Sequence, residues 1–334
     1  MKIIRKICFP FVPVYFLITR LRNALYDYGV LKSTSYNFPV ICVGNLNVGG
    51  TGKTPMIEYL IKLLKNDYKV ATLSRGYKRK TSGFRIGDEQ SIVETLGDEP
   101  FQFYNKFGHD ITVAVDANRR QGIANLMNLE MPPEVILLDD AFQHRKVKAG
   151  FNILLSAYNN LYTKDILLPT GNLREPRLGA KRADVIIVTK CPEEIQDHEK
   201  SKILDAIAPE DYQQVFFSSI QYDSNVYAHD GKLKLTSLND FCLVTGIANP
   251  NSMVNYLKGN QLNFEHLNYD DHYNFTDQDV LLLSTKSLIL TTEKDYMRLK
   301  QYEVLKGKLF YLPITVVLND PERFNALIKS FVKT

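Results

Sequence analysis

Several patterns that would assign this 334-residue chain to a common protein class are missing from it. Its four cysteines lie far apart and form no C-x-x-C pair, which argues against a zinc motif or a disulfide framework and favours a reducing compartment. The net charge of +4 is too small to indicate nucleic-acid binding, so no nucleic-acid partner is expected. No internal repeat or low-complexity tract is visible. What remains is an ordinary globular composition, in a chain long enough for two domains.

A long hydrophobic run is also missing, because the longest uncharged apolar stretch covers only residues 7–19. A membrane-spanning helix needs about 20 apolar residues, and this stretch is shorter and contains Pro10 and Pro13. No small-residue cleavage site of a signal peptide precedes Arg20 and Arg22. Basic flanks and aromatic residues fit a segment lying in a membrane interface. A helix packed on the protein's own core fits the sequence equally well.

The clearest motif that is present is a phosphate-binding loop over residues 44–55, Gly-Asn-Leu-Asn-Val-Gly-Gly-Thr-Gly-Lys-Thr-Pro. An apolar run predicted as a strand (38–43) precedes it, and a run with helical spacing (56–64) follows it. Glycines let backbone N–H groups turn towards an anion, and the helix N-terminus adds partial positive charge. An incidental glycine-rich turn is the alternative, which the strand–loop–helix order disfavours.

Within this loop, Lys53 is expected to reach the β- and γ-phosphates and Thr54 to ligate Mg²⁺. Asn47 stands where the usual motif has its first glycine, and we expect it to adopt the left-handed backbone angles that asparagine tolerates. The residues predicted to bind the nucleotide are Asn47, Val48, Gly49, Gly50, Thr51, Gly52, Lys53 and Thr54.

Strands alternate with helical stretches along the chain, which predicts an α/β fold of the P-loop NTPase type, with a mostly parallel sheet covered by helices on both faces. A more polar texture between residues 210 and 237 predicts a linker, after which strands and helices alternate again in a second, smaller α/β domain. The predicted division is an N-terminal helical segment (1–35), a P-loop core domain (36–220), a linker (221–240) and a C-terminal α/β domain (241–334).

Two carboxylates, Asp139 and Asp140, end an apolar strand predicted over residues 135–140. Functional residues of such sheets gather at the carboxyl ends of the strands, and an acid at this position holds Mg²⁺ in phosphate-loop enzymes. Adjacent strand side chains point to opposite faces, so the two should not share one role. An ordinary acidic turn is the alternative.

Three further polar groups have both a functional and a structural interpretation. Asp98, in Gly-Asp-Glu-Pro at 97–100, fits a general base and fits a helix start equally well. His272 lies in a polar loop, where a histidine either orients a base or, more commonly, is solvated. Arg174 belongs to an arginine-containing loop suited to phosphate or to surface ion pairs.

Guanine specificity is not supported by the sequence. GTPases use [NT]-K-x-D, whereas residues 292–295 read Thr-Glu-Lys-Asp in the wrong order, and residues 189–192 read Thr-Lys-Cys-Pro without the aspartate.

Taken together, these motifs resemble the tetraacyldisaccharide 4'-kinases of lipid A biosynthesis, and they follow the family order from residue 43 to residue 295. The family's loop also lacks the first glycine. The motifs that carry the resemblance are the loop at 44–55, Gly-Asp-Glu-Pro at 97–100, Asp-Asp-Ala-Phe-Gln-His at 139–144, Leu-Arg-Glu-Pro at 173–176, Asp-His at 271–272 and Thr-Glu-Lys-Asp at 292–295.

The resemblance implies ATP- and Mg²⁺-dependent transfer of the γ-phosphate to the 4'-hydroxyl of an acylated glucosamine disaccharide 1-phosphate. It also implies that a closing second domain brings His272 to Asp98, which would act as the base. The implied residues are Lys53, Asp98 and His272 for catalysis, Thr54, Glu99, Asp139 and Asp140 for the metal, and Arg119, Arg120, Gln143 and Arg174 for the substrate.

The same resemblance implies an amphipathic N-terminal helix that meets the cytoplasmic face of the bacterial inner membrane as a peripheral contact, kinked by Pro10 and Pro13. The partners it implies are the acylated disaccharide lipid and the membrane surface, with no obligate protein partner. A GTPase-type nucleotide switch acting on a protein is the alternative, and a non-catalytic membrane adaptor is a third interpretation.

Overall fold

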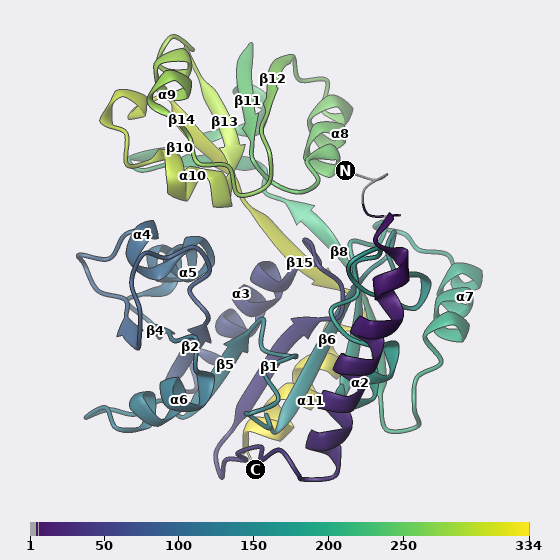
Figure 1. The fold of residues 1–334 in the computed structure, drawn as a ribbon. Coiled ribbons are helices and arrows are strands. Elements are labelled where there is room, and N and C mark those ends of the chain that lie inside the picture. Colours follow the sequence, from purple (N-terminus) through teal and green to yellow (C-terminus); the bar gives the residue numbers. More distant parts are fainter. Residues whose placement is uncertain (1–4, 6, 334) are drawn as a thin grey trace.

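The computed structural model describes residue 5 and residues 7–333, in which two β-sheets form two separate units (Figure 1). The larger sheet has nine strands in the order β15-β8-β7-β6-β1-β5-β2-β4-β3, and its seven inner strands are parallel. The strands are β1 (Val40–Asn45), β2 (Val70–Ser74), β3 (Arg85–Ile86), β4 (Thr112–Val115), β5 (Val135–Asp139), β6 (Phe151–Ala157), β7 (Val185–Thr189), β8 (Gln214–Tyr222) and β15 (Ile314–Leu318).

Alternation along the strands sends side chains into two hydrophobic clusters, one on each face of the larger sheet. In β1, Val40 and Cys42 enter one cluster, whereas Ile41 and Val43 enter the other. On the first face lie α6 (Arg119–Met127) and α7 (Asp197–Ile207), and on the second lie α3 (Lys53–Leu64), α5 (Asp98–Phe107) and α11 (Pro321–Lys333). Helices on both faces of a mostly parallel sheet confirm the predicted fold class.

The smaller sheet has six strands in the order β10-β9-β14-β13-β11-β12. They are β9 (Asn225–Ala228), β10 (Gly231–Lys234), β11 (Phe241–Thr245), β12 (Phe264–Asn268), β13 (Ile289–Thr292) and β14 (Leu309–Leu312). Its helices are α8 (Asn251–Gly259), α9 (Asp277–Ser284) and α10 (Glu293–Leu299). Helix α9 is capped at its N-terminus, because Thr276 and Asp279 form a reciprocal capping box. Helix α10 packs against α5 of the larger unit through a shared hydrophobic cluster.

The chain crosses between the two units twice, whereas the sequence predicts a single linker between two consecutive domains. The predicted linker region contains β8, which pairs with β7 in the larger sheet, and β9 and β10, which belong to the smaller one. Near the C-terminus, β15 returns to pair antiparallel with β8, and α11 buries Phe324 and Ile328 against the larger sheet. The sequence predicts β15 and α11 within the C-terminal domain, and the strand pairing corrects that assignment. Periodicity identifies a strand, whereas its neighbour in the sheet is decided by long-range packing.

The N-terminal segment forms a short 3₁₀ turn (Phe9–Phe11) and then α2 (Val12–Asp27). Pro13 lies in the first turn of α2, where a missing N–H costs nothing, so it begins the helix and does not kink it. No residue of α2 is buried. Among the described residues, no helix is long and apolar enough to cross a bilayer.

Candidate functional site

The loop between β1 and α3 has the geometry of an anion-binding turn. Gly49 and Gly52 adopt φ of 118° and 87°, values that side chains rarely tolerate, so these positions require glycine. The hydroxyl of Thr51 accepts a hydrogen bond from Asn45 Nδ2 at 2.8 Å, and its carbonyl accepts one from Thr189 Oγ1 at 2.8 Å. The loop is thereby fixed to two neighbouring strand ends, and α3 begins at Lys53.

Asn47 takes its place in this loop for a different reason from the one expected. The left-handed residues of the loop are the glycines and not Asn47, whose side chain is buried and donates to Asp165 Oδ2 at 3.0 Å. Its backbone also forms an isolated bridge to Leu173. Asparagine therefore serves here as a buried hydrogen-bond donor to a neighbouring loop.

Two lysines face the loop. Lys53 Nζ lies 3.4 Å from Asn45 Oδ1 and 3.7 Å from Asp140 Oδ1. Lys190 follows β7 with a φ of 59°, and its Nζ lies 3.7 Å from where a Cβ on Gly50 would stand. Lys190 has no acidic partner in the described part of the chain, and burial together with the charge of Lys53 lowers its pKa. Two ammonium groups therefore border the loop, and the one without an acidic partner would attract an anion bound there.

Asp139 is a buried carboxylate with a raised pKa at this edge of the sheet. Its Oδ2 accepts from Ser74 Oγ at 3.1 Å, while its buried Oδ1 has no hydrogen-bond partner among the described residues. Burial, followed by the nearby charges of Glu99 and Asp140, raises the pKa of Asp139 to about 7. A buried carboxylate with an unsatisfied oxygen and acidic neighbours is the environment that a cation would relieve.

Asp140, in contrast, is fully paired with an arginine. Both of its oxygens accept from Arg174 Nη1, at 2.8 and 2.9 Å, and the charges of Lys53 and Arg174 overcome burial and lower its pKa. Asp140 lies just after the end of β5 with a φ of 47°, and the two adjacent aspartates have different hydrogen-bond partners. No group of three or more acidic, histidine or cysteine side chains in the described residues is preassembled as a metal site. Mg²⁺ usually takes only one or two protein carboxylates and completes its shell with phosphates and water.

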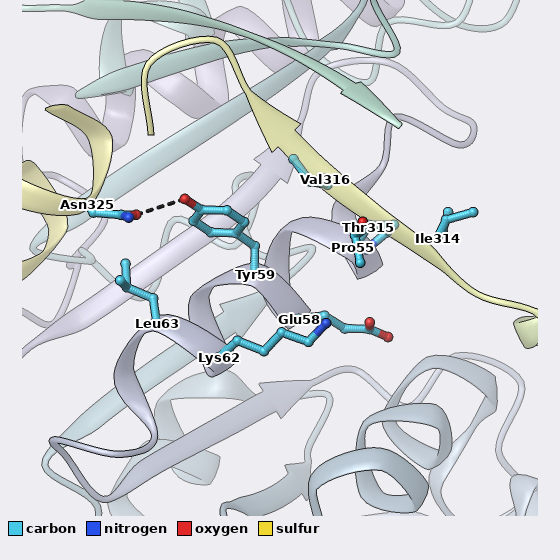
Figure 2. Close-up of a pocket in the computed structure, with 9 residues that line it drawn as sticks. All are labelled: Pro55, Glu58, Tyr59, Lys62, Leu63, Ile314, Thr315, Val316 and Asn325. Atoms are coloured by element: carbon cyan, nitrogen blue, oxygen red, sulfur yellow. Dashed lines mark hydrogen bonds between the residues drawn. The ribbon is translucent and has the colours of Figure 1, made fainter. Parts of the chain in front are cut away.

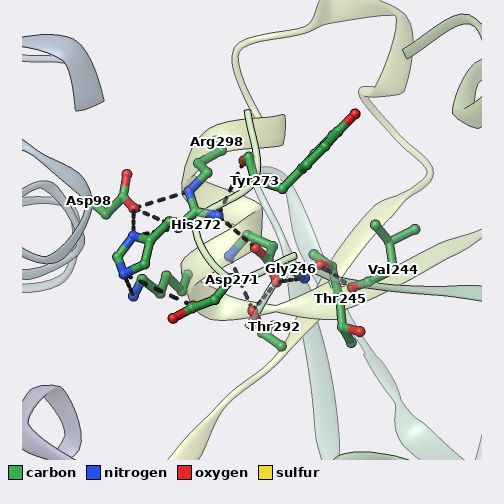
Figure 3. Close-up of polar contacts among 12 residues, drawn as sticks. Asp98, Val244, Thr245, Gly246, Asp271, His272, Tyr273, Thr292 and Arg298 are labelled. Carbon is green, nitrogen blue, oxygen red and sulfur yellow. Dashed lines mark hydrogen bonds and ion pairs between the residues drawn. The ribbon is translucent and has the colours of Figure 1, made fainter. Parts of the chain in front are cut away.

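The second cluster surrounds Asp98, the first residue of α5 (Figure 3). Its Oδ2 accepts from His272 Nδ1 at 2.8 Å and from Arg298 Nε at 3.1 Å and Nη2 at 2.5 Å. Burial alone would raise the pKa of Asp98, but these hydrogen bonds hold it well below its usual range. Asp98 therefore begins a helix and is held ionised by groups from the smaller unit, while its role as a base stays a prediction.

Lys294 links this cluster to the acidic side of the site. Its Nζ lies 3.0 Å from His272 Nε2 and 3.8 Å from Glu99 Oε1. The backbone of His272 adopts φ 57°, and its carbonyl accepts from Lys78 Nζ at 2.9 Å. His272 is therefore clamped between the units rather than solvated.

Gln143 and Arg174 lie where β1 passes into the phosphate loop, and the backbone N–H of Arg174 donates to the carbonyl of Leu46 at 2.8 Å. Gln143 Nε2 donates to the carbonyl of Asn45 at 2.8 Å and to Glu175 Oε1 at 3.0 Å. Glu175 is buried and also accepts from Asn23 of α2 at 2.7 Å. These contacts tie the end of β1 to the loop that carries Arg174 and to the N-terminal helix.

The predicted arginine pair on α6 is split. Arg119 is buried, and its guanidinium donates to the carbonyls of Asp116 at 3.1 Å and Asp139 at 3.4 Å, which braces the end of β5. Arg120 is exposed and forms no ion pair within the described residues.

Sequence reasoning missed Arg298, Lys190 and Glu175. Arg298 has no local signature, since it follows the Thr-Glu-Lys-Asp motif by three residues and meets Asp98 across 200 positions of sequence. Lys190 lies in a motif that was weighed only for guanine specificity. Glu175 is adjacent to Arg174, and its burial was the missing signal.

Comparisons with known proteins agree with these motifs. Residues 4–333 match the family described as Tetraacyldisaccharide-1-P 4'-kinase. A tetraacyldisaccharide 4'-kinase from Flavobacterium johnsoniae is 51% identical, over 100% of this chain and 98% of that protein. One from Bacteroides fragilis is 44% identical, over 99% and 94%. Among solved structures, LpxK from Aquifex aeolicus in complex with ATP superposes with a TM-score of 0.79 at 31% identity, covering 98% of this chain and 99% of that one.

Proposed function

The chain belongs to the tetraacyldisaccharide-1-P 4'-kinase family, and on that basis we propose that it transfers the γ-phosphate of ATP to the 4'-hydroxyl of a tetraacyl disaccharide 1-phosphate. The product is the bis-phosphorylated lipid A precursor. The observation that carries the proposal is the pairing of a lysine-lined phosphate loop with an ionised, clamped carboxylate on the neighbouring helix α5. A phosphoryl donor and an acceptor hydroxyl need those two environments next to each other.

The nucleotide phosphates would bind to the backbone of residues 47–52, with Lys53 offsetting the negative charge of the transferring group. The residues fit Mg²⁺ as well. Asp139, with its unpartnered buried oxygen, would be the direct carboxylate ligand, with Thr54 and Glu99 beside it. Asp140 is committed to Arg174 and would instead position that arginine. When bound, Mg²⁺ would supply neutralisation of phosphate charge.

Asp98 would accept the proton of the sugar hydroxyl. Its pKa is low, which makes it a weak base, yet phosphoryl transfer proceeds through a loose transition state that asks little of the base before the phosphate has moved. His272 and Arg298 would orient Asp98, so that one oxygen is held by them and the other is left for the hydroxyl.

Helix α2 would place the enzyme on the membrane that holds its lipid substrate, as a peripheral protein on the cytoplasmic face of the bacterial inner membrane. Large apolar side chains of the N-terminal segment are exposed by more than half of their surface, namely Ile7, Phe9, Phe11, Val14, Leu17, Ile18 and Leu21. Tyr15 on the same helix donates to the carbonyl of Arg174 at 2.8 Å. One face of α2 therefore docks on the site while the apolar residues remain for lipid.

This placement can be tested by co-sedimentation with vesicles containing anionic lipid. Leu17→Glu should lower the bound fraction several-fold because a charge replaces an exposed apolar contact. The control is Lys333→Glu, at an exposed position of α11, which packs on the opposite face of the larger sheet from α2. Equal binding by both variants and the parent protein would exclude α2 as the membrane contact.

The activity itself is tested by transfer of label from γ-labelled ATP to tetraacyl disaccharide 1-phosphate in detergent. Label should appear in the lipid, and Lys53→Met should reduce its rate by at least a hundredfold. The nucleotide-switch alternative predicts preference for GTP and no lipid product. It is not favoured, because Pro192 stands where guanine recognition requires an aspartate. Unlabelled lipid with an active nucleotide-binding protein would refute the proposed reaction.

A further inference from the structure

A buried charge cluster that takes no part in the site lies near the opposite end of α5 from Asp98. Lys106 Nζ lies 2.6 Å from Glu58 Oε2 and 2.8 Å from Glu293 Oε1. Glu58 Oε1 also accepts from Gln102 Nε2 at 2.8 Å. The carboxylates retain only 3% and 6% of their exposure, so these ion pairs are shielded from water. Shielded charges interact strongly and are costly to separate.

Each of the three residues lies on a helix that also carries a residue of the proposed active site. Glu58 lies in α3, which begins at Lys53, and Lys106 lies in α5, which begins at Asp98. Glu293 is the first residue of α10, the helix that brings Arg298 to Asp98. The first two helices belong to the larger unit and the third to the smaller one, so the cluster crosses between the units.

The cluster supplies a further polar attachment between α10 and α5, in addition to the hydrophobic packing of the two helices. The Asp98 cluster lies eight residues earlier in α5, which corresponds to about 12 Å along a helix. Polar contacts separated by this distance resist a rotation of α10 on α5 that non-directional apolar contacts alone would permit. The direction of α10 decides where the guanidinium of Arg298 lies relative to Asp98.

The cluster has two carboxyl groups for one ammonium, and burial together with the charge of Glu58 raises the pKa of Glu293 to about 7. Burial opposes the charge of Lys106, but Glu58 and Glu293 outweigh it and raise its pKa. Lys62 extends towards Glu58 along α3, at the edge of a groove between that helix and β15 (Figure 2), and its charge also acts on Glu293. Lys106 is therefore the one cation in contact with both carboxylates among the described residues.

We propose that Glu58, Lys106 and Glu293 form an interdomain latch, which holds the smaller unit in the orientation that presents Arg298 and His272 to Asp98. The three are positioning residues, since none of them contacts the phosphate loop or Asp98. The inference rests on the proposed kinase function for its effect on rate, whereas the orientation of the units is a property of the protein alone.

The charges of the cluster predict an order of activities among three variants. Lys106→Met leaves two buried carboxylates facing each other, and kcat should fall at least tenfold while the Kd for ATP stays within twofold, since the phosphate loop is untouched. Glu293→Gln replaces the ion pair to the smaller unit with a neutral hydrogen bond from Lys106 and leaves the Glu58–Lys106 pair intact, so kcat should fall, but by less than in Lys106→Met. Lys106→Met combined with Glu293→Gln should be more active than Lys106→Met alone, because only one carboxylate remains unpaired.

The matched control is Lys65→Met. Lys65 pairs with Asp110 on the surface and joins the same two helical segments, but it does not reach the smaller unit. Its kcat should stay within twofold of the parent protein. A Lys106→Met protein as active as this control, or a double variant no better than Lys106→Met, would overturn the latch.

A distance measurement separates the latch from the reaction. Spin labels at Ala124→Cys in α6 and Ser252→Cys in α8, both exposed, report the separation of the units in a Cys8→Ser background whose remaining cysteines are buried. The distance distribution should be narrow in the parent and in Lys65→Met and broad in Lys106→Met. An unchanged distribution in Lys106→Met would refute the latch. A broadened one in a protein that proves to have no kinase activity would sustain the latch and refute the proposed function.

Discussion

Replacing Asp98 with asparagine isolates the chemical role of the carboxylate with the least change in shape. The variant keeps one hydrogen-bond acceptor for Arg298 and His272 but cannot take a proton. A positioned general base contributes roughly 10²–10⁴-fold to a rate. Because the pKa of Asp98 lies well below its usual range, its basicity is reduced, and we place the loss at the lower end, about 10²–10³-fold. That corresponds to about 3–4 kcal/mol of transition-state stabilisation.

The structure also predicts what the substitution leaves alone. Asp98 makes no contact with the loop between β1 and α3, so the Kd for ATP from calorimetry should stay within about twofold. Arg298 loses a charged partner but retains Asp295 Oδ1 at 3.1 Å, so the fold should persist with a lowered melting temperature.

The matched control is Asp295→Asn, which removes the other carboxylate of the same buried arginine. Both variants remove a charged partner of Arg298, and Asp295 in addition accepts from Gly246 N and Thr292 Oγ1, but only the first removes the proposed base. Initial rates of lipid phosphorylation at saturating ATP compare them. If Asp98→Asn is no slower than Asp295→Asn, or keeps more than a fifth of the parent kcat, the reasoning that makes Asp98 the base fails.

Four further outcomes follow from particular contacts. Arg298→Met should raise the pKa of Asp98, because burial is then opposed mainly by the hydrogen bond from His272. The acid limb of the pH–rate profile should move to higher pH, and an unmoved limb would show that Arg298 does not set it. Burial and the charge of a neighbouring carboxylate raise the pKa of Glu293 from 4.5 to about 7. Between those pH values the folded chain holds a proton that the unfolded chain has lost, so the free energy of unfolding falls as pH rises. Glu293→Gln should remove this slope, worth at most about 3 kcal/mol, in urea unfolding at pH 5 and 7.5; parallel slopes in the two proteins would contradict the assignment. Lys190→Met should weaken ATP binding by about tenfold in calorimetry, through loss of an unpaired cation beside the loop, and unchanged affinity would place its ammonium away from the nucleotide. Phe324→Ala should lower the free energy of unfolding by about 3–5 kcal/mol, because this fully buried ring joins α11 to the larger sheet, and a loss below 1 kcal/mol would argue that α11 does not belong to that core.

Local features of this chain were readable from the sequence because their cause is local. The phosphate loop is specified by Gly49 and Gly52, whose backbone angles need glycine, between an apolar strand and a helix of regular period. Asp139 could be placed because carboxyl ends of parallel strands share one edge of the sheet. The capping box at Thr276 needs only a spacing of three residues.

The three-dimensional structure decided everything that depends on which distant segments meet. No spacing rule brings His272 and Arg298 to one oxygen of Asp98, because those contacts require the order of the strands and the packing of α10 on α5. The return of β15 to the larger sheet was hidden for the same reason, since its periodicity fits either sheet. The sequence determined the groups that could do the chemistry, whereas long-range packing and burial determined which carboxylate is ionised, which is unsatisfied and which lysine holds the units together.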